Sequence, residues 1–202
     1  LLVVGGLYMG VFTATEAAAI GAFGAFVIWL VRRKFSWENL QKSMKETGKT
    51  TCMIFFIIIG AMLFNYFLAV SGLPTNLSTW VVGLSVPPMA VVGIMLLIYV
   101  PMGMFMEALA MVILTIPIFV PVIVALGFSP IWFGVLVVIM VEMAQITPPV
   151  GLAVFVMKGI AKEVPLTTIF RGIMPFALAD AVCAGLVFAF PQIALLLPRL
   201  MK

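Results

Sequence analysis

The longest uncharged interval of this chain lies between Lys49 and Glu107, where 57 consecutive residues include no Asp, Glu, Lys or Arg. A helix needs about 20 apolar residues to cross the hydrocarbon core of a bilayer, so this interval alone is long enough for two crossings. Charged residues make up 9% of the 202 residues, whereas soluble domains carry roughly 25%. The mean hydropathy is +1.32. The sequence therefore predicts an all-α polytopic membrane protein.

Most of the basic residues gather in one short region between apolar segments. They are Arg32, Arg33, Lys34, Lys42, Lys45 and Lys49. Loops that stay in the cytoplasm carry an excess of Lys and Arg, so this region is predicted to be cytoplasmic. The net charge of +4 then reflects membrane orientation and not nucleic-acid binding. The chain begins with Leu and has no charged region before a cleavage site, so we expect it to be the later part of a longer polypeptide.

The sequence lacks the residues and motifs of several common enzyme classes. The chain has no His, which excludes a Ser–His dyad and the common zinc ligand sets. Asp180 is the only Asp, so a paired-aspartate protease is excluded as well. Neither a GxSxG elbow nor a GxxxxGK[ST] loop occurs. We therefore expect no enzyme, no catalytic residue and no transition-metal site.

The hydropathy pattern and the positions of Pro and Gly residues, which interrupt helices, predict five segments. The first helix is predicted to begin at a capping box formed by Thr13 and Glu16. The segments are a transmembrane helix with an amphipathic interfacial helix (1–48), a transmembrane helix with a connection on the outer side (49–87), a reentrant helical hairpin (88–127), a broken transmembrane helix (128–163), and an interfacial segment with the last transmembrane helix (164–202).

Two interruptions of the apolar pattern point to function. One is PMGMFME at 101–107 and the other is QITPPVG at 145–151. Irregular backbone at membrane depth is tolerated where protein buries it or where it lines a watery cavity. Simple Pro kinks are the structural alternative for each break, and two full crossings fit 88–127 as well as two reentrant arms. In transporters, broken helices expose carbonyl groups that bind Na⁺ and amides that attract anions.

Individual residues at these breaks suggest separate roles. Thr147 offers a hydroxyl ligand, and Pro148 and Pro149 remove two amide donors, which frees carbonyl groups one turn earlier. Glu107 either complements a helix N-terminus or contacts substrate or a gate. Glu142 precedes the second break; an embedded acid there suggests function, with an interhelical hydrogen bond as the alternative.

Five motifs, in order, carry a resemblance to a known family. They are GVFTATEAAA (10–19), GMFME (103–107), LTIPIFVP (114–121), GFSPIWFG (127–134) and ITPPVG (146–151). The chain resembles the large membrane subunit of a tripartite ATP-independent periplasmic (TRAP) transporter, and its general style is similar to the sialic-acid members. The family often has Thr-Pro-Thr-Glu where this chain has Ala14, a difference that affects the helix start and no evident site.

The resemblance implies two inverted repeats that move as an elevator, of which this chain would be the C-terminal one. It implies the N-terminal repeat, a small membrane subunit (separate or fused) and a periplasmic substrate-binding protein as partners, in the bacterial inner membrane. It also implies a Na⁺ site between the first and second breaks. The sodium-binding candidates are Gly103, Met106, Gln145, Thr147, Pro149 and Gly151. The substrate or gate candidates are Glu107, Glu142, Ile146 and Pro148.

The function expected from these observations is Na⁺-coupled uptake of an organic acid, such as sialic acid or a dicarboxylate. A periplasmic binding protein would deliver the substrate, and Na⁺ would be the coupling ion. A passive channel and a non-transporting scaffold subunit are the alternatives.

Overall fold

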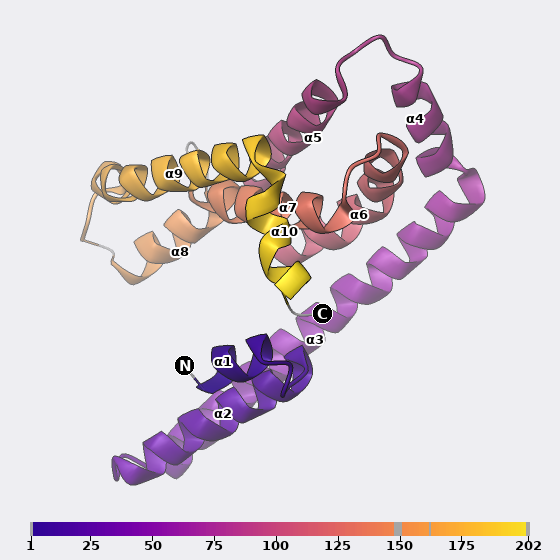
Figure 1. Cartoon of the computed structure of the whole chain (residues 1–202). Helices are drawn as coiled ribbons and strands as arrows, with labels where there is room; N and C mark the ends of the chain where they lie inside the picture. Colours follow the sequence, from indigo (N-terminus) through magenta and orange to yellow (C-terminus); the bar gives the residue numbers. More distant parts are fainter. Residues whose placement is uncertain (1, 148–150, 162, 201–202) are drawn as a thin grey trace. The chain divides into compact units, whose positions relative to one another are not determined.

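The computed structural model describes residues 2–147, 151–161 and 163–200, and every regular element among them is an α-helix (Figure 1). The chain divides into two compact units. One comprises Leu1–Ile54 with Leu196–Lys202, and the other comprises Phe55–Leu195.

The first unit begins with α1 (Leu2–Tyr8) and α2 (Ala14–Val31). The predicted capping box is confirmed. The amide of Thr13 donates to the Glu16 carboxylate at 2.8 Å, and the Glu16 amide donates to the Thr13 hydroxyl at 3.3 Å. These two bonds satisfy donors that a helix start otherwise leaves unpaired.

At its other end, α2 closes with a turn that normally uses glycine. The Lys34 amide donates to the Trp29 carbonyl and the Arg33 amide to the Leu30 carbonyl, which is the Schellman arrangement. Arg33 occupies its left-handed position with φ 52°. A residue with a β-carbon held there costs on the order of 1 kcal/mol.

Helix α3 (Trp37–Ser71) is continuous through the point at which the sequence predicted a boundary, near residue 48. The composition changes there from charged to apolar, but no Pro interrupts the backbone, and Gly48 alone does not end a helix. At 1.5 Å per residue, 35 residues have a contour length of about 52 Å, against a hydrocarbon core of about 30 Å. The apolar part after Lys49 is by itself long enough to cross.

In the second unit, α4 (Leu73–Val82) leads to a helical hairpin made of α5 (Pro88–Gly103) and α6 (Ala108–Ala125). The two arms share a buried hydrogen bond of 2.6 Å between the Tyr99 and Thr115 hydroxyls. Because Thr115 donates its own hydrogen to the Met111 carbonyl at 2.8 Å, Tyr99 must be the donor to Thr115.

Helix α7 (Pro130–Ile146) is the centre of this unit and contacts α5, α6, α8 and α9. Its buried residues form two adjacent rows with a spacing of four, which is the pattern of a helix that packs on more than one side. The rows are Trp132, Leu136, Met140 and Ala144, and Phe133, Val137 and Val141.

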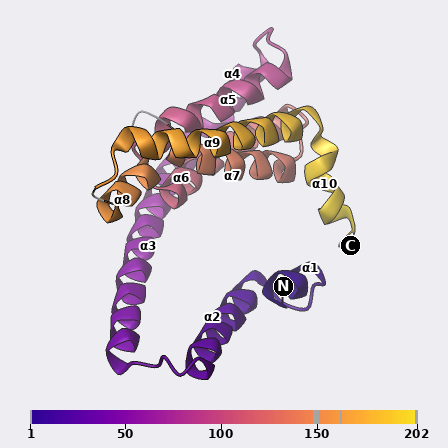
Figure 2. The same cartoon turned by 90° about the vertical axis from the view of Figure 1, so that its left-hand side faces the viewer.

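After α8 (Leu152–Ile160), α9 (Leu166–Ala189) lies alongside α7 in both views (Figures 1 and 2). The Trp132 indole N–H donates to the Val187 carbonyl at 2.8 Å. In a continuing helix that carbonyl would pair with residue 191, which is Pro and has no amide hydrogen. Trp132 therefore replaces the donor that Pro191 lacks.

The last predicted segment, 164–202, contains two helices in its described part. Its first residues join α9 without a break, and Pro165 is the N-cap of that helix. Helix α9 stops at Ala189, and Pro191 starts a separate helix, α10 (Pro191–Leu200). Pro is favoured at a first helical position and breaks a helix that would run through it.

Among the described residues, four helices are long and apolar enough to cross a membrane: α2, α3, α6 and α9. Helices α5 and α7 are apolar but shorter. The predicted fold class, an all-α polytopic membrane protein, is confirmed. The division into five segments, the reentrant path of the hairpin and the elevator motion stay predictions.

Candidate ion-binding site

The first break forms the turn of the α5–α6 hairpin. The amides of Phe105 and Met106 both donate to the Met102 carbonyl, at 3.1 and 2.9 Å, which closes the turn tightly. Glu107 then starts α6 as its N-cap, and its carboxylate accepts from the Leu109 amide at 3.0 Å and the Ala110 amide at 3.2 Å. Of the two roles predicted for Glu107, the structure shows the capping one.

The second break ends α7 through an exchange of hydrogen-bond partners. The Thr147 amide, which a continuing helix would give to Met143, donates instead to the Ala144 carbonyl at 3.3 Å. The Thr147 hydroxyl takes its place and donates to the Met143 carbonyl at 2.6 Å. Since the hydroxyl hydrogen is used in this bond, its oxygen keeps lone pairs for a cation.

The Gln145 carbonyl lacks its regular helical donor at the second break. Its regular helical donor would be residue 149, a Pro, which has no amide hydrogen. Gly151, with φ 56°, brings the chain back against this point. A β-carbon at Gly151 would lie 3.0 Å from the Gln145 carbonyl oxygen and 3.3 Å from that of Thr147. Two carbonyl oxygens therefore surround one position that only glycine leaves open.

The two breaks meet at Gly103 and Ala144. Gly103 is buried, and a β-carbon there would overlap the Ala144 β-carbon and lie 3.2 Å from the Ala144 carbonyl carbon. The absence of a side chain at residue 103 therefore lets the end of α5 touch the backbone of α7 just before its break. Far apart in sequence, the hairpin turn and the broken helix form one region of the second unit.

Helix polarity gives this region its electrostatic character. Because Gly103 is the last residue of α5 and Ala144 lies in the last turn of α7, two helix C-termini converge. Each carries about half a negative charge and up to four carbonyl groups without an intrahelical donor. Neutral oxygen ligands of this kind suit a hard cation. The described residues contain no group of three or more His, Cys, Asp or Glu side chains that would hold a transition metal.

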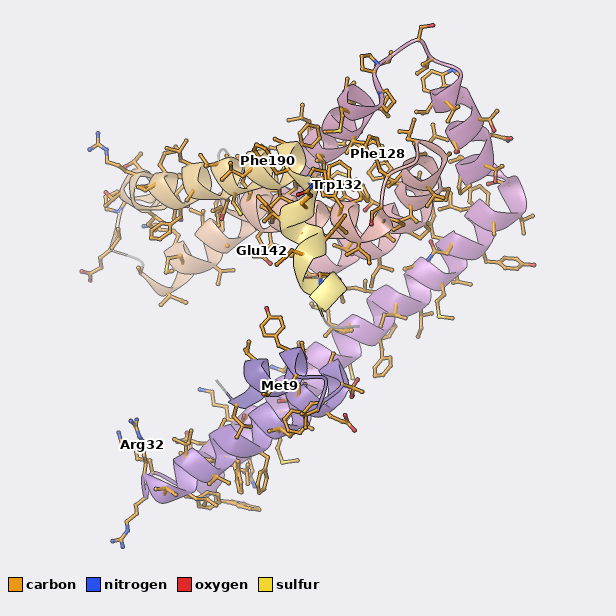
Figure 3. The ribbon with its side chains drawn as sticks, in the orientation of Figure 1. Met9, Arg32, Phe128, Trp132, Glu142 and Phe190 are labelled. Carbon is orange, nitrogen blue, oxygen red and sulfur yellow. The ribbon has the colours of Figure 1, made fainter. Side chains whose placement is uncertain are left out.

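The remaining predicted site residues are distributed unevenly. Met106, Gln145 and Ile146 are half-buried next to the contact. Glu142 is exposed, off the two buried rows of α7 (Figure 3). Pro148 and Pro149 lie outside the described residues. The substrate or gate role of Glu107, Glu142, Ile146 and Pro148 stays a prediction.

Sequence reasoning missed a groove of about 600 Å³ beside the second break. Met143 and Thr147 form one wall, and α9 forms the other with Arg171, Met174 and Leu178 among its lining residues. Arg171 lies within α9 and shares this groove with Thr147. The available signal was its position as the only basic residue between Lys162 and Arg199.

Comparison with known proteins decides the family. The family model of the tripartite ATP-independent periplasmic transporter, DctM component, matches residues 1–193. The chain belongs to this family. As the sequence predicted, it is a family of transport proteins and not of enzymes.

Curated relatives of this DctM-family chain carry different substrate names. It is 38% identical to the C4-dicarboxylate TRAP transporter large permease protein DctM of Pseudomonas aeruginosa, over 98% of this chain and 47% of the relative. It is 31% identical to the sialic acid TRAP transporter large permease protein SiaM of Vibrio cholerae, over 99% and 47%. It is 29% identical to the ectoine/5-hydroxyectoine TRAP transporter large permease protein UehC of Ruegeria pomeroyi, over 98% and 46%. The DctM-family chain thus spans about half the length of these relatives.

Proposed function

We propose that this chain forms one half of the membrane path of a TRAP transporter in the bacterial inner membrane, and that the meeting of its two breaks is a Na⁺ site that couples the ion to uptake of an organic acid. The observation that carries the proposal is the contact of Gly103 with Ala144, which brings two carbonyl-rich helix ends together. The other half of the permease, a small membrane subunit and a periplasmic binding protein would complete the assembly.

The proposed Na⁺ ligands are neutral oxygens of the two breaks. The carbonyls of Gln145 and Thr147 lie on one side of Gly151, and the Thr147 hydroxyl oxygen is held in place by its bond to Met143. The last carbonyls of α5 would complete the set from the hairpin side. A site built from two separate helices binds the ion only while they touch, so its occupancy favours the closed arrangement of hairpin and broken helix.

An organic anion would approach the start of α8. Gly151 is the N-cap of that helix and provides no side-chain hydrogen bond, and the Val154 amide donates to the Gly151 carbonyl at 2.9 Å. The amides of Leu152 and Ala153 are therefore the ones that we propose for a carboxylate. The corresponding amides of α6 are already used by Glu107. Of the two helix starts that follow the breaks, α8 is therefore the better anion site.

The test is uptake into proteoliposomes that contain the complete assembly, with a binding protein loaded with sialate or with a C4-dicarboxylate. Uptake should saturate with substrate and require an inward sodium gradient. A potassium gradient of the same size is the control. Uptake that proceeds equally with either gradient would refute sodium coupling, and uptake that does not saturate would indicate a passive channel.

A further inference from the structure

A groove in the first unit, far in sequence from either break, has the chemistry of a lipid site. Its volume is about 550 Å³. Helix α2 contributes Ala22, Ala25, Phe26 and Trp29, which share one helical face. The start of α3 contributes Asn39, Leu40 and Ser43. The two helices diverge from the short turn that joins them (Figure 2). Residues of both helices line the groove.

The groove has an apolar body and a polar edge. Phe26, Trp29 and Phe35 contact one another through their rings, with centroid separations of 5.0–6.5 Å. The side chains of Asn39 and Ser43 form no hydrogen bond with any other described side chain or backbone group. Such a surface matches a molecule with an acyl chain and ester groups, because the esters would accept hydrogen bonds from both side chains.

Positive charge is concentrated in the turn between α2 and α3 and in the first part of α3. Residues 32–49 contain six Lys or Arg and two Glu, and one of these, Glu46, is already paired with Lys49 at 3.1 Å. Arg32 lies at the turn between the two helices (Figure 3). Basic clusters next to a transmembrane helix attract anionic lipid headgroups, and aromatic residues are enriched at that depth.

Arg33 adds an independent observation. It occupies the left-handed position of the turn that closes α2, where glycine fits without strain. Arg makes the turn less stable than Gly would, so an outlier of this kind points to a role for the side chain. Its guanidinium has no hydrogen bond or ion pair with any described residue.

We propose that one anionic phospholipid binds here, with its phosphate at the Arg32–Arg33 turn and an acyl chain between α2 and α3. The charge complementarity selects an anionic headgroup over a zwitterionic one, and the apolar wall selects a lipid over a free phosphate. The site is independent of the ion-binding region and of the transported substrate.

Native mass spectrometry of the complete transporter assembly in detergent, titrated with dioleoyl phosphatidylglycerol or dioleoyl phosphatidylcholine, tests the proposal. Phosphatidylglycerol should bind more tightly. Arg33→Gly, which suits the backbone of the turn, should weaken its binding roughly fivefold, the effect of about 1 kcal/mol for one cation at an anionic surface. Lys45→Gln removes a charge from the same basic cluster but lies outside the groove lining, so it should weaken phosphatidylglycerol binding less than Arg33→Gly does.

A second pair of variants examines the acyl-chain path. Ala25→Leu fills the groove and should weaken phosphatidylglycerol binding severalfold, whereas Ala19→Leu, on an exposed part of the same helix, should not. The proposal is overturned if the two lipids bind equally, or if Arg33→Gly binds phosphatidylglycerol like the wild type. It is also overturned if lipid binds the isolated chain but is excluded from the assembly, because a protein partner would then occupy the groove.

Discussion

At the scale of single residues, two glycines determine the geometry of the proposed ion site. Gly103 allows a helix end to touch backbone, and Gly151 leaves the space between two carbonyl oxygens open. Neither contributes a side chain. Each matters because a β-carbon at its position would push against the neighbouring backbone or side-chain atoms. Thr147, in contrast, contributes a side chain. Its hydroxyl hydrogen is donated to the Met143 carbonyl, so its oxygen can serve as a ligand.

Gly103→Ala should reduce sodium-dependent uptake at least tenfold. The added methyl group overlaps Ala144 and separates the hairpin turn from α7, a strain of about 1–3 kcal/mol. Gly134→Ala is the matched control, because a β-carbon at that α7 position meets nothing within 4 Å. Uptake by both variants in proteoliposomes decides the point, and an active Gly103→Ala protein with wild-type sodium dependence would contradict the proposed site.

Thr147→Ala should raise the sodium concentration needed for half-maximal uptake while the protein still assembles. The change removes a proposed ligand and the bond to the Met143 carbonyl, whereas Thr147→Ser keeps both. Measuring uptake by the two variants as a function of sodium concentration distinguishes the contribution of the hydroxyl group from that of the methyl group. Unchanged sodium activation in Thr147→Ala would remove the hydroxyl from the ligand set.

At the scale of elements, the ends of helices were predictable where a side chain or an imino acid determines them. The Thr13–Glu16 capping box and the interruption of the helix before Pro148 follow from local chemistry, and both predictions match the helices observed. The predicted segment boundary near residue 48 does not coincide with a helix end, because a change from charged to apolar residues does not by itself interrupt the helical backbone.

Contacts between elements could not be predicted from local patterns. The sequence indicates only that Gly103 belongs to an interruption of the apolar pattern. The packing of α5 on α7 shows that it lies against Ala144. The Trp132–Val187 bond is another case, although Pro191 does signal a carbonyl in need of a donor. Arg171 shares a groove with Thr147 because α9 folds back along α7, which no motif indicates.

Trp132→Phe should lower the free energy of unfolding by about 1–3 kcal/mol, because the Val187 carbonyl is buried with no replacement donor. Thermal melting in detergent measures the loss. In the double variant with Pro191→Ala, the new amide supplies a donor to the same carbonyl, so part of the loss should be recovered. A double variant that melts no higher than Trp132→Phe alone would show that ring packing, and not the hydrogen bond, accounts for the effect.

At the scale of the whole molecule, the membrane class and family follow from the sequence with little ambiguity. Composition and the long uncharged interval predict a membrane protein, and the five ordered motifs indicate the TRAP transporter family. The side of the membrane on which each connection lies rests on the positive-inside rule alone. The coupling ion, the substrate and the partners depend on the complete assembly, of which this chain corresponds to about half of the permease.

Labelling with a membrane-impermeant maleimide tests the orientation. In a protein without Cys52 and Cys183, a cysteine at Lys34 should react only after the cells are permeabilised, since the basic region is predicted to be cytoplasmic. A cysteine at Ser85, in the connection between α4 and α5, should react in cells whose outer membrane alone has been opened. The reverse pattern would invert the predicted orientation.

The contact of Gly103 with Ala144 also limits how this family can vary. Because the two positions share one small space, an enlargement at one is tolerated only with a reduction at the other. Gly103→Ala combined with Ala144→Gly should therefore recover uptake that Gly103→Ala loses. Across related permeases, the summed volume at these two positions should stay small even where each residue changes, which makes the pair a covariation signal for the junction between hairpin and broken helix.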